Sequence, residues 1–137
     1  MKLLIAIFFF HICSYSQNLI GEWKLVSFQD EKIYYNIEKD SIFPKDSWNE
    51  NDEMTIFVKN AFRNTNIKFT KAKYFVMNSQ ITGNRNSKYE LDQKNSIIIL
   101  EDENIDNSKI QYHYILEDYI LNLKLADNIN LKFRKKD

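Results

Sequence analysis

Gly21-Glu22-Trp23, within the run LIGEWKLVS at residues 19–27, is the most informative part of the sequence. The chain contains only two glycines in 137 residues. A glycine directly before an apolar run therefore indicates a backbone conformation that other residues adopt poorly. We predict that a β-strand covering residues 22–28 begins at this point.

Residues 1–16 have the parts of a secretory signal peptide. A lysine at the second position precedes an apolar run, and Ser14 and Ser16 are the small residues that a signal peptidase reads. The apolar run is too short to span a bilayer as a helix. We predict cleavage after Ser16, a secreted or periplasmic location, and one domain at residues 17–137 without a transmembrane segment.

Cys13 offers an alternative, which is a lipoprotein anchor. A lipoprotein signal has a leucine and then small residues before its cysteine, whereas Phe10-His11-Ile12 are bulky. We therefore favour a soluble exported product over lipidation. Cys13 is also the only cysteine of the chain, so the mature domain has no disulfide and depends on its core.

Alternation of apolar and polar residues dominates the second half of the chain. A period of two in β-branched and aromatic residues is typical of half-buried strands. Short Asn- and Asp-containing separators between the segments predict hairpin turns. The apolar faces are Ile110, Tyr112, Tyr114 and Leu116, then Tyr119, Leu121, Leu123 and Leu125, then Ile129, Leu131 and Phe133.

Eight strands follow from these patterns. Four more segments, at residues 66–70, 74–78, 87–92 and 96–101, form two hairpins, and the strand at 22–28 completes the set. Eight antiparallel strands close into a small barrel that can hold one ligand, and closure removes exposed sheet edges. We predict an all-β fold, an eight-stranded antiparallel up-and-down barrel, with an insertion at about residues 29–65 after the first strand.

The insertion does not fit a simple meander. We predict extra strands at residues 32–36 and 54–59, and no amphipathic helix anywhere. Phe43 and Trp48 lie in the connection at residues 37–53, where large aromatic residues argue against a disordered linker. Our hypothesis is that this connection folds as a lid over the open mouth of the barrel, with Trp48 or Phe43 at the entrance.

The chain resembles the small secreted lipocalin-like proteins of Bacteroidota, which belong to the wider calycin group. The likeness covers residues 19–135, and residues 19–27 carry its Gly-x-Trp strand opening. It implies that Gly21 and Trp23 form the barrel floor, with the indole of Trp23 as a plug. It also implies that Arg134 stacks over that indole, although alternation places Arg134 on the face opposite Phe133. Leu116-Glu117-Asp118-Tyr119 would be the turn between the sixth and seventh strands.

Composition and motifs exclude several function classes. Nineteen Lys and Arg balance nineteen Asp and Glu. The protein therefore has no net positive charge that would attract it to nucleic acid or to an anionic membrane. His113 is the only histidine after the leader and falls on a polar strand face, which leaves no base beside a nucleophile. The calcium-like run at residues 102–106 is followed neither by the glycine that a calcium loop needs for its turn nor by the glutamate that would complete the ligands. We expect no enzymatic activity, no cofactor and no metal.

Aromatic and apolar side chains on the predicted inner face are the candidate ligand-binding residues. They either line a cavity, where tyrosine hydroxyls would orient a ligand, or simply fill the small interior of an eight-stranded barrel. The sequence leaves both interpretations open. The candidates are Phe69, Tyr89, Tyr112, Tyr114, Leu123 and Phe133, with Trp48 from the lid.

Two functions remain on these grounds. The first is a non-enzymatic lipocalin-like barrel that binds a small apolar or amphipathic ligand outside the cytoplasm. The alternative is a protein–protein interaction module, of the inhibitor or immunity type, with a filled barrel. The sequence names neither the ligand nor a protein partner.

Overall fold

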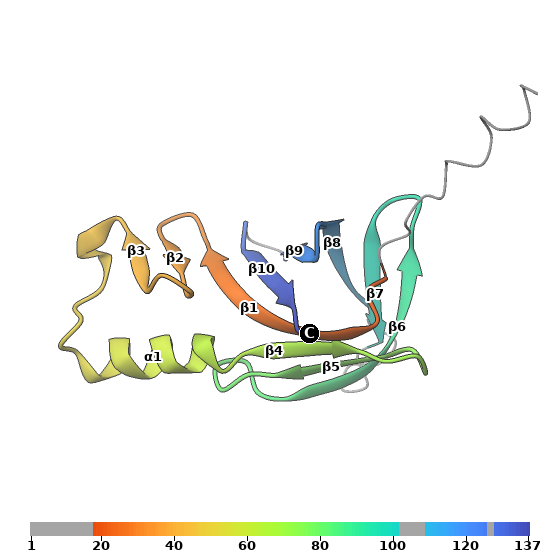
Figure 1. Cartoon of the computed structure of the whole chain (residues 1–137), viewed down its shortest axis with the longest axis horizontal. Coiled ribbons are helices and arrows are strands. Elements are labelled where there is room, and N and C mark those ends of the chain that lie inside the picture. The colour runs from red at the N-terminus through yellow and green to blue at the C-terminus, as the bar shows by residue number, and fades with distance from the viewer. Residues whose placement is uncertain (1–17, 102–108, 126–127) are drawn as a thin grey trace, which may run out of the picture.

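Eight strands close into an antiparallel barrel in the computed structural model (Figure 1), which describes residues 18–101, 109–125 and 128–137. Neighbouring strands along the chain pair with each other, and the last strand pairs with the first. The predicted fold class is confirmed. The predicted leader with its cleavage site after Ser16, Cys13, and the calcium-like run at residues 102–106 lie outside the described residues. The barrel strands are β1 (Gly21–Gln29), β4 (Asn66–Phe69), β5 (Tyr74–Asn78), β6 (Arg85–Asp92), β7 (Ile97–Glu101), β8 (Lys109–Glu117), β9 (Ile120–Lys124) and β10 (Asn130–Lys135).

The insertion between β1 and β4 builds an extension at one end of the barrel. It contains β2 (Tyr34–Asn36), β3 (Ser41–Phe43), the short 3-10 helix η1 (Lys45–Ser47) and the helix α1 (Glu53–Arg63). Because β2 pairs with the second half of β1 and β3 pairs with β2, the sheet continues beyond the barrel wall. Figure 1 shows α1 in line with β4, opposite β2 and β3 across the extension.

The predicted strand at residues 54–59 is wrong, as is the expectation that the chain has no amphipathic helix. Thr55, Lys59 and Phe62 recur at helical spacing and face the β2–β3 hairpin side. Glu53 in the first turn and Arg63 in the last turn have the signs that suit the helix dipole. The run Ile56-Phe57-Val58 has high strand propensity, but this preference is weak against packing in three dimensions.

A β-bulge in β1 sets the geometry of the barrel wall. The pairing with β10 joins Leu25 to Phe133 and then Phe28 to Leu131, so β1 uses three residues where β10 uses two. A bulge of this kind bends the strand and resets its alternation. At the same place β1 changes its other neighbour from β4 to β2. The first half of β1 therefore lies between β10 and β4, and the second half lies between β10 and β2 of the extension.

The interior beside the start of β1, called here the Trp23 end, is filled by side chains. Trp23 is completely buried, and its indole Nε1–H donates a hydrogen bond of 2.8 Å to the carbonyl oxygen of Leu19. Gly21 has a φ of +131°, which side-chain-bearing residues rarely adopt, and a Cβ there would lie 3.0 Å from Cε of Lys135. The first glycine thus has the backbone role that the sequence indicates.

Lys135, and not Arg134, covers the indole of Trp23. The Nζ atom of Lys135 lies 5.3 Å from the ring centroid and donates a hydrogen bond to the Asn18 carbonyl oxygen. Arg134 points to the outer face and pairs with Glu38, its Nε lying 3.0 Å from Oε1. The stacking expected of Arg134 is therefore wrong, because the alternation of β10 holds with no bulge at its end.

A double-mutant cycle tests this assignment. Trp23→Leu combined with Lys135→Met should give a coupling free energy of about 0.5–1 kcal/mol, as for a partly exposed cation over an aromatic ring. The matched cycle with Arg134→Met should give a coupling near zero, because Arg134 lies on the other face of β10. Urea unfolding measures both, and the reverse ranking would restore Arg134 as the partner of Trp23.

The hairpin between β8 and β9, the sixth and seventh barrel strands, turns at Asp118-Tyr119. Both residues have positive φ, 48° and 61°, as in the tight turns that suit twisted hairpins. The turn lies where the sequence predicts it, but Tyr119 occupies the loop and is 72% exposed. The prediction that Tyr119 continues the inner face of the following strand is wrong.

Candidate functional site

A cavity of about 390 Å³ opens at the end of the barrel opposite Trp23, called here the cavity end. Its walls come from the barrel strands, from the β5–β6 connection and from the last turn of α1. Leucine, isoleucine, phenylalanine and methionine make most of the surface. The lining residues are Leu25, Phe28, Phe62, Thr65, Met77, Ser79, Ile81, Thr82, Gly83, Arg85, Tyr112, Leu125, Ile129 and Leu131.

The bulge in β1 is what places two large side chains in this cavity. Leu25 and Phe28 both face inward, opposite Phe133 and Leu131 of β10, because the bulge falls between them. Uninterrupted alternation would turn Phe28 to the outside. The same break frees space beside β4, where the Leu25 backbone N–H donates to the carbonyl oxygen of Thr65. The cavity therefore lies where β1 changes its neighbour from β4 to β2.

Aromatic stacking connects the cavity wall to the extension. The ring of Phe62 on α1 lies 4.8 Å from that of Phe28, and on its other side it stacks with Trp48 at 6.4 Å. Tyr35 on β2 contacts both Trp48 and Phe62. Phe62 thus belongs at once to the cavity and to the small core of the extension, so movement of α1 would change the cavity.

A polar cluster around the buried Lys59 connects α1 to the β2–β3 hairpin. Lys59 is buried, and its Nζ lies 3.2 Å from Asp40 and 3.5 Å from Glu50. Asp40 also accepts a hydrogen bond from the Tyr35 hydroxyl and pairs with Arg63. Burial and the bond to Asp40 raise the pKa of Tyr35 to about 12. Although burial alone would raise the pKa of Asp40, the hydrogen bonds from Tyr35 and Lys59 keep it below its usual value.

Polar groups in the cavity gather at the connection between β5 and β6. The Ser79 hydroxyl oxygen accepts hydrogen bonds from the backbone N–H groups of Ile81 and Thr82. Thr65 donates its hydroxyl proton to the Ala61 carbonyl oxygen at 2.8 Å. Arg85, the first residue of β6, adds the one charged side chain among the described lining residues.

Of the seven predicted ligand-binding residues, only Tyr112 lines the cavity. Four are buried in the packed interior, where the ring of Phe69 lies 5.1 Å from that of Tyr89. Tyr114 is half-buried against the same core. The interpretation of a filled interior thus holds for the Trp23 end, and the interpretation of a cavity holds for the other end. The four buried residues are Phe69, Tyr89, Leu123 and Phe133.

The predicted lid over residues 37–53 differs from the structure in its details. Phe43 is 71% exposed and Trp48 packs inside the extension, so neither lines the cavity. The insertion does reach the cavity, but through Phe62 and Thr65, which lie after the predicted lid segment. The prediction missed them because residues 54–59 were assigned to a strand, which hides the helical spacing that places Phe62 inward.

Arg85 is the residue that the sequence should have revealed. Counting back by two from the inward Tyr89 gives Ser87 and then Arg85, so alternation alone places a cation on the inner face of β6. Because the predicted strand begins at residue 87, Arg85 is not among the predicted residues of the inner face. Phe28 carried no such signal, since nothing in residues 21–29 marks the bulge.

Metal-binding groups, membrane-spanning helices and the position of His113 bear on other kinds of site among the described residues. Among residues 18–101, 109–125 and 128–137, no group of three or more His, Cys, Asp and Glu side chains is placed to hold a metal ion. Within the same ranges, no helix is both long and apolar enough to cross a membrane. His113 is exposed on the outer face of β8, as its position in the alternation predicts.

Comparison with known proteins supports the fold. The crystal structure of a DUF4847 family protein from Bacteroides vulgatus ATCC 8482 is similar over 87% of this chain and 96% of that chain, with a TM-score of 0.53 and 18% sequence identity. At this identity the likeness shows the fold alone, a closed barrel. No protein-family model and no curated protein matches the sequence.

Proposed function

We propose that this protein is a non-enzymatic, lipocalin-like barrel that binds a small apolar or amphipathic molecule outside the cytoplasm. The observation that carries the proposal is the apolar cavity at the end opposite Trp23. Its volume of about 390 Å³ falls in the range of about 300–1,000 Å³ that is usual for ligand pockets. The leader pattern of residues 1–16 supports the location.

The construction of the barrel supports binding over catalysis. One end is packed solid around Trp23 and provides a rigid scaffold, while the other end is lined by aliphatic and aromatic side chains with a few polar groups at one edge. Sites that bind amphipathic molecules commonly have this division between an apolar wall and a small number of placed polar groups. His113 faces away from the cavity, on the outer surface of β8.

Filling the cavity should abolish binding of an apolar dye. Leu131 lies on the inner face of β10 and lines the cavity, so Leu131→Trp places an indole in the space that a ligand would use. We expect the affinity for an uncharged naphthylamine dye to fall by about tenfold or more, equivalent to about 1.4 kcal/mol. Dye fluorescence measures this on the exported protein.

Ile115→Trp is the matched control, because Ile115 is 59% exposed on the outer face of β8. It adds the same side chain outside the barrel and should leave dye affinity unchanged. Thermal melts of both variants confirm that each is folded. Equal dye affinity in the parent protein and in folded Leu131→Trp would mean that the dye binds elsewhere, and the proposed site would be wrong.

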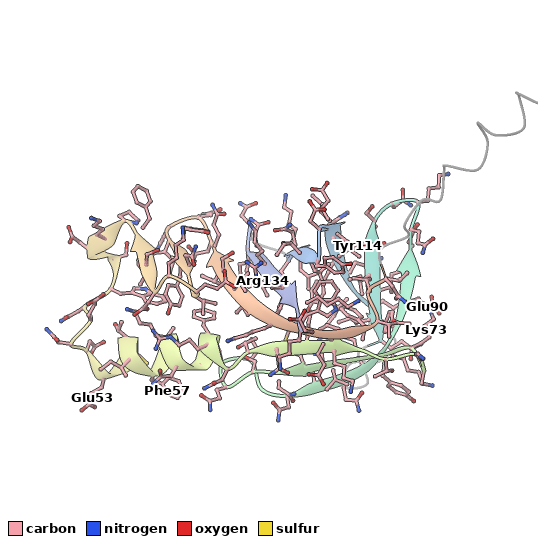
Figure 2. All side chains as sticks on the ribbon, in the orientation of Figure 1. Glu53, Phe57, Lys73, Glu90, Tyr114 and Arg134 are labelled. Atoms are coloured by element: carbon pink, nitrogen blue, oxygen red, sulfur yellow. The ribbon has the colours of Figure 1, made fainter. Side chains whose placement is uncertain are left out.

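A second candidate function rests on the surface of the extension. Large apolar side chains are exposed there, and Figure 2 shows Phe57 with Glu53 on the side of α1 that faces away from β2 and β3. Exposed apolar residues on one face of a helix can contribute to a protein-binding surface. Native mass spectrometry of the protein purified from its host distinguishes the candidates: a retained small molecule supports the cavity, and a stoichiometric protein partner supports the extension. The exposed residues are Phe43, Met54, Ile56 and Phe57.

A further inference from the structure

We propose that the cavity selects amphipathic anions, namely aliphatic carboxylates of medium length, and that Arg85 binds the carboxylate. This inference rests on the proposed function, because it names the ligand class of the same cavity. Its basis is one side chain whose position and surroundings differ from those of every other described arginine.

Arg85 lies on the inner face of β6, directly opposite Met77 of β5. Its Nη1 atom is buried and has no hydrogen-bond partner among the described residues. The other two described arginines, Arg63 and Arg134, are each paired with a carboxylate on the surface. Within the described part of the chain, no aspartate or glutamate lines the cavity to balance Arg85.

A buried guanidinium nitrogen without a partner is costly, because it has lost its hydration and gained no hydrogen bond. An incoming carboxylate removes this cost, since the planar fork of arginine matches the two carboxylate oxygens. A neutral headgroup offers a weaker bond, and an ammonium group would meet a like charge in an apolar site. The cavity is therefore arranged to favour an anion.

The apolar walls define the rest of the ligand. Besides Arg85, the cavity is lined by apolar side chains that carry no polar atoms, among them Leu25, Phe28, Leu125, Ile129 and Leu131. A water molecule takes about 30 Å³ in the liquid and a methylene group is of similar size. A cavity of about 390 Å³ therefore holds roughly a dozen non-hydrogen atoms. Decanoate has this size, with its carboxylate at one end.

The test compares decanoate with its uncharged analogue 1-decanol, both below the concentration at which they self-associate, by displacement of the naphthylamine dye at neutral pH. We expect the protein to bind decanoate about tenfold or more tightly than decanol, as for a hydrogen bond to a charged group. Arg85→Met keeps an unbranched, flexible side chain and removes the charge and the N–H donors, so it should abolish this preference. Arg85→Lys keeps the charge but not the fork and should retain part of it.

Lys88→Met is the matched control, because Lys88 is exposed on the outer face of the same strand. It removes one positive charge from the protein and should leave the preference for decanoate intact. Without ligand, Arg85→Met should melt at a higher temperature than the parent protein, since the buried Nη1 atom without a hydrogen-bond partner is gone. A lower melting temperature would instead mean that Arg85 has a structural partner, and the assignment would be wrong.

The outcomes separate this inference from the proposed function. If the parent protein binds neither decanoate nor decanol and does not bind the dye, the proposed function fails. If it binds both with equal affinity, or if Arg85→Met binds decanoate as the parent does, the cavity binds ligands but the role of Arg85 is refuted. Preference for decanoate that is lost in Arg85→Met and kept in Lys88→Met supports the inference.

Discussion

Replacing Trp23 with alanine should lower the free energy of unfolding by about 3–5 kcal/mol, the range found for large aromatic side chains deleted from cores. Trp23 is completely buried, so its removal leaves a void at the Trp23 end. It also leaves the carbonyl oxygen of Leu19 without the hydrogen bond that it accepts from the indole N–H. Against a typical total of about 5–15 kcal/mol, this is the largest loss that we expect from any substitution discussed. Urea unfolding measures the change.

Trp23→Phe is the informative companion to that variant. It keeps most of the apolar volume but loses the hydrogen bond to Leu19, so its loss should be smaller than that of alanine. A loss below about 1 kcal/mol for Trp23→Ala would contradict the account. It would mean that the packing at the Trp23 end does not need the indole of Trp23. The side chains around Phe133 would then remain stable beside the void.

Phe62→Ala should have the second-largest effect, a loss of about 3 kcal/mol, near the lower end of the range for buried aromatic residues because Phe62 is only partly buried. Its ring joins Phe28 of the cavity wall to Trp48 of the extension. Without it, α1 loses its main apolar contact with the barrel, and the cavity gains a gap in its wall. We therefore expect weaker dye binding together with lower stability.

Phe57→Ala in the same helix is the control. Phe57 is 53% exposed, so its removal should change the free energy of unfolding by no more than about 0.5 kcal/mol and leave dye binding as it is. Calorimetry and dye titration on the two variants measure both effects. Equal small losses for Phe62→Ala and Phe57→Ala would mean that α1 does not support the cavity, contrary to the packing described.

The barrel could be predicted from the sequence because its information is local. Alternation over residues 110–133 fixes which side chains face inward, and the Asn- and Asp-containing separators fix the turns. The helix α1 could have been found from the spacing of Thr55, Lys59 and Phe62, although a threonine and a lysine on the buried face conceal the pattern. Lys59 can be buried because Asp40 and Glu50, which lie outside α1, pair with its charge. These contacts exist only in the folded protein, so the sequence of the helix does not reveal them.

The candidate site was harder to predict because it depends on breaks in the regular pattern. Tyr112 follows the alternation and lines the cavity, whereas Phe69, Tyr89, Leu123 and Phe133 follow the same rule and are buried in the packed interior. Alternation identifies the inner face but not the depth along the barrel. Depth is set by the bulge in β1 and by the change of partner from β4 to β2. Neither leaves a mark in the sequence.

Methyl NMR of the folded protein during a titration with decanoate tests the central claim most directly. Binding in the cavity should produce saturable shifts in the methyl groups of Ile129 and Leu131, which line it. The methyl groups of Ile67 and Leu121, buried at the Trp23 end, should change little. Shifts confined to Ile56 on the outer face of α1, or no saturable shift at all, would contradict the account of this barrel as a binder of amphipathic molecules.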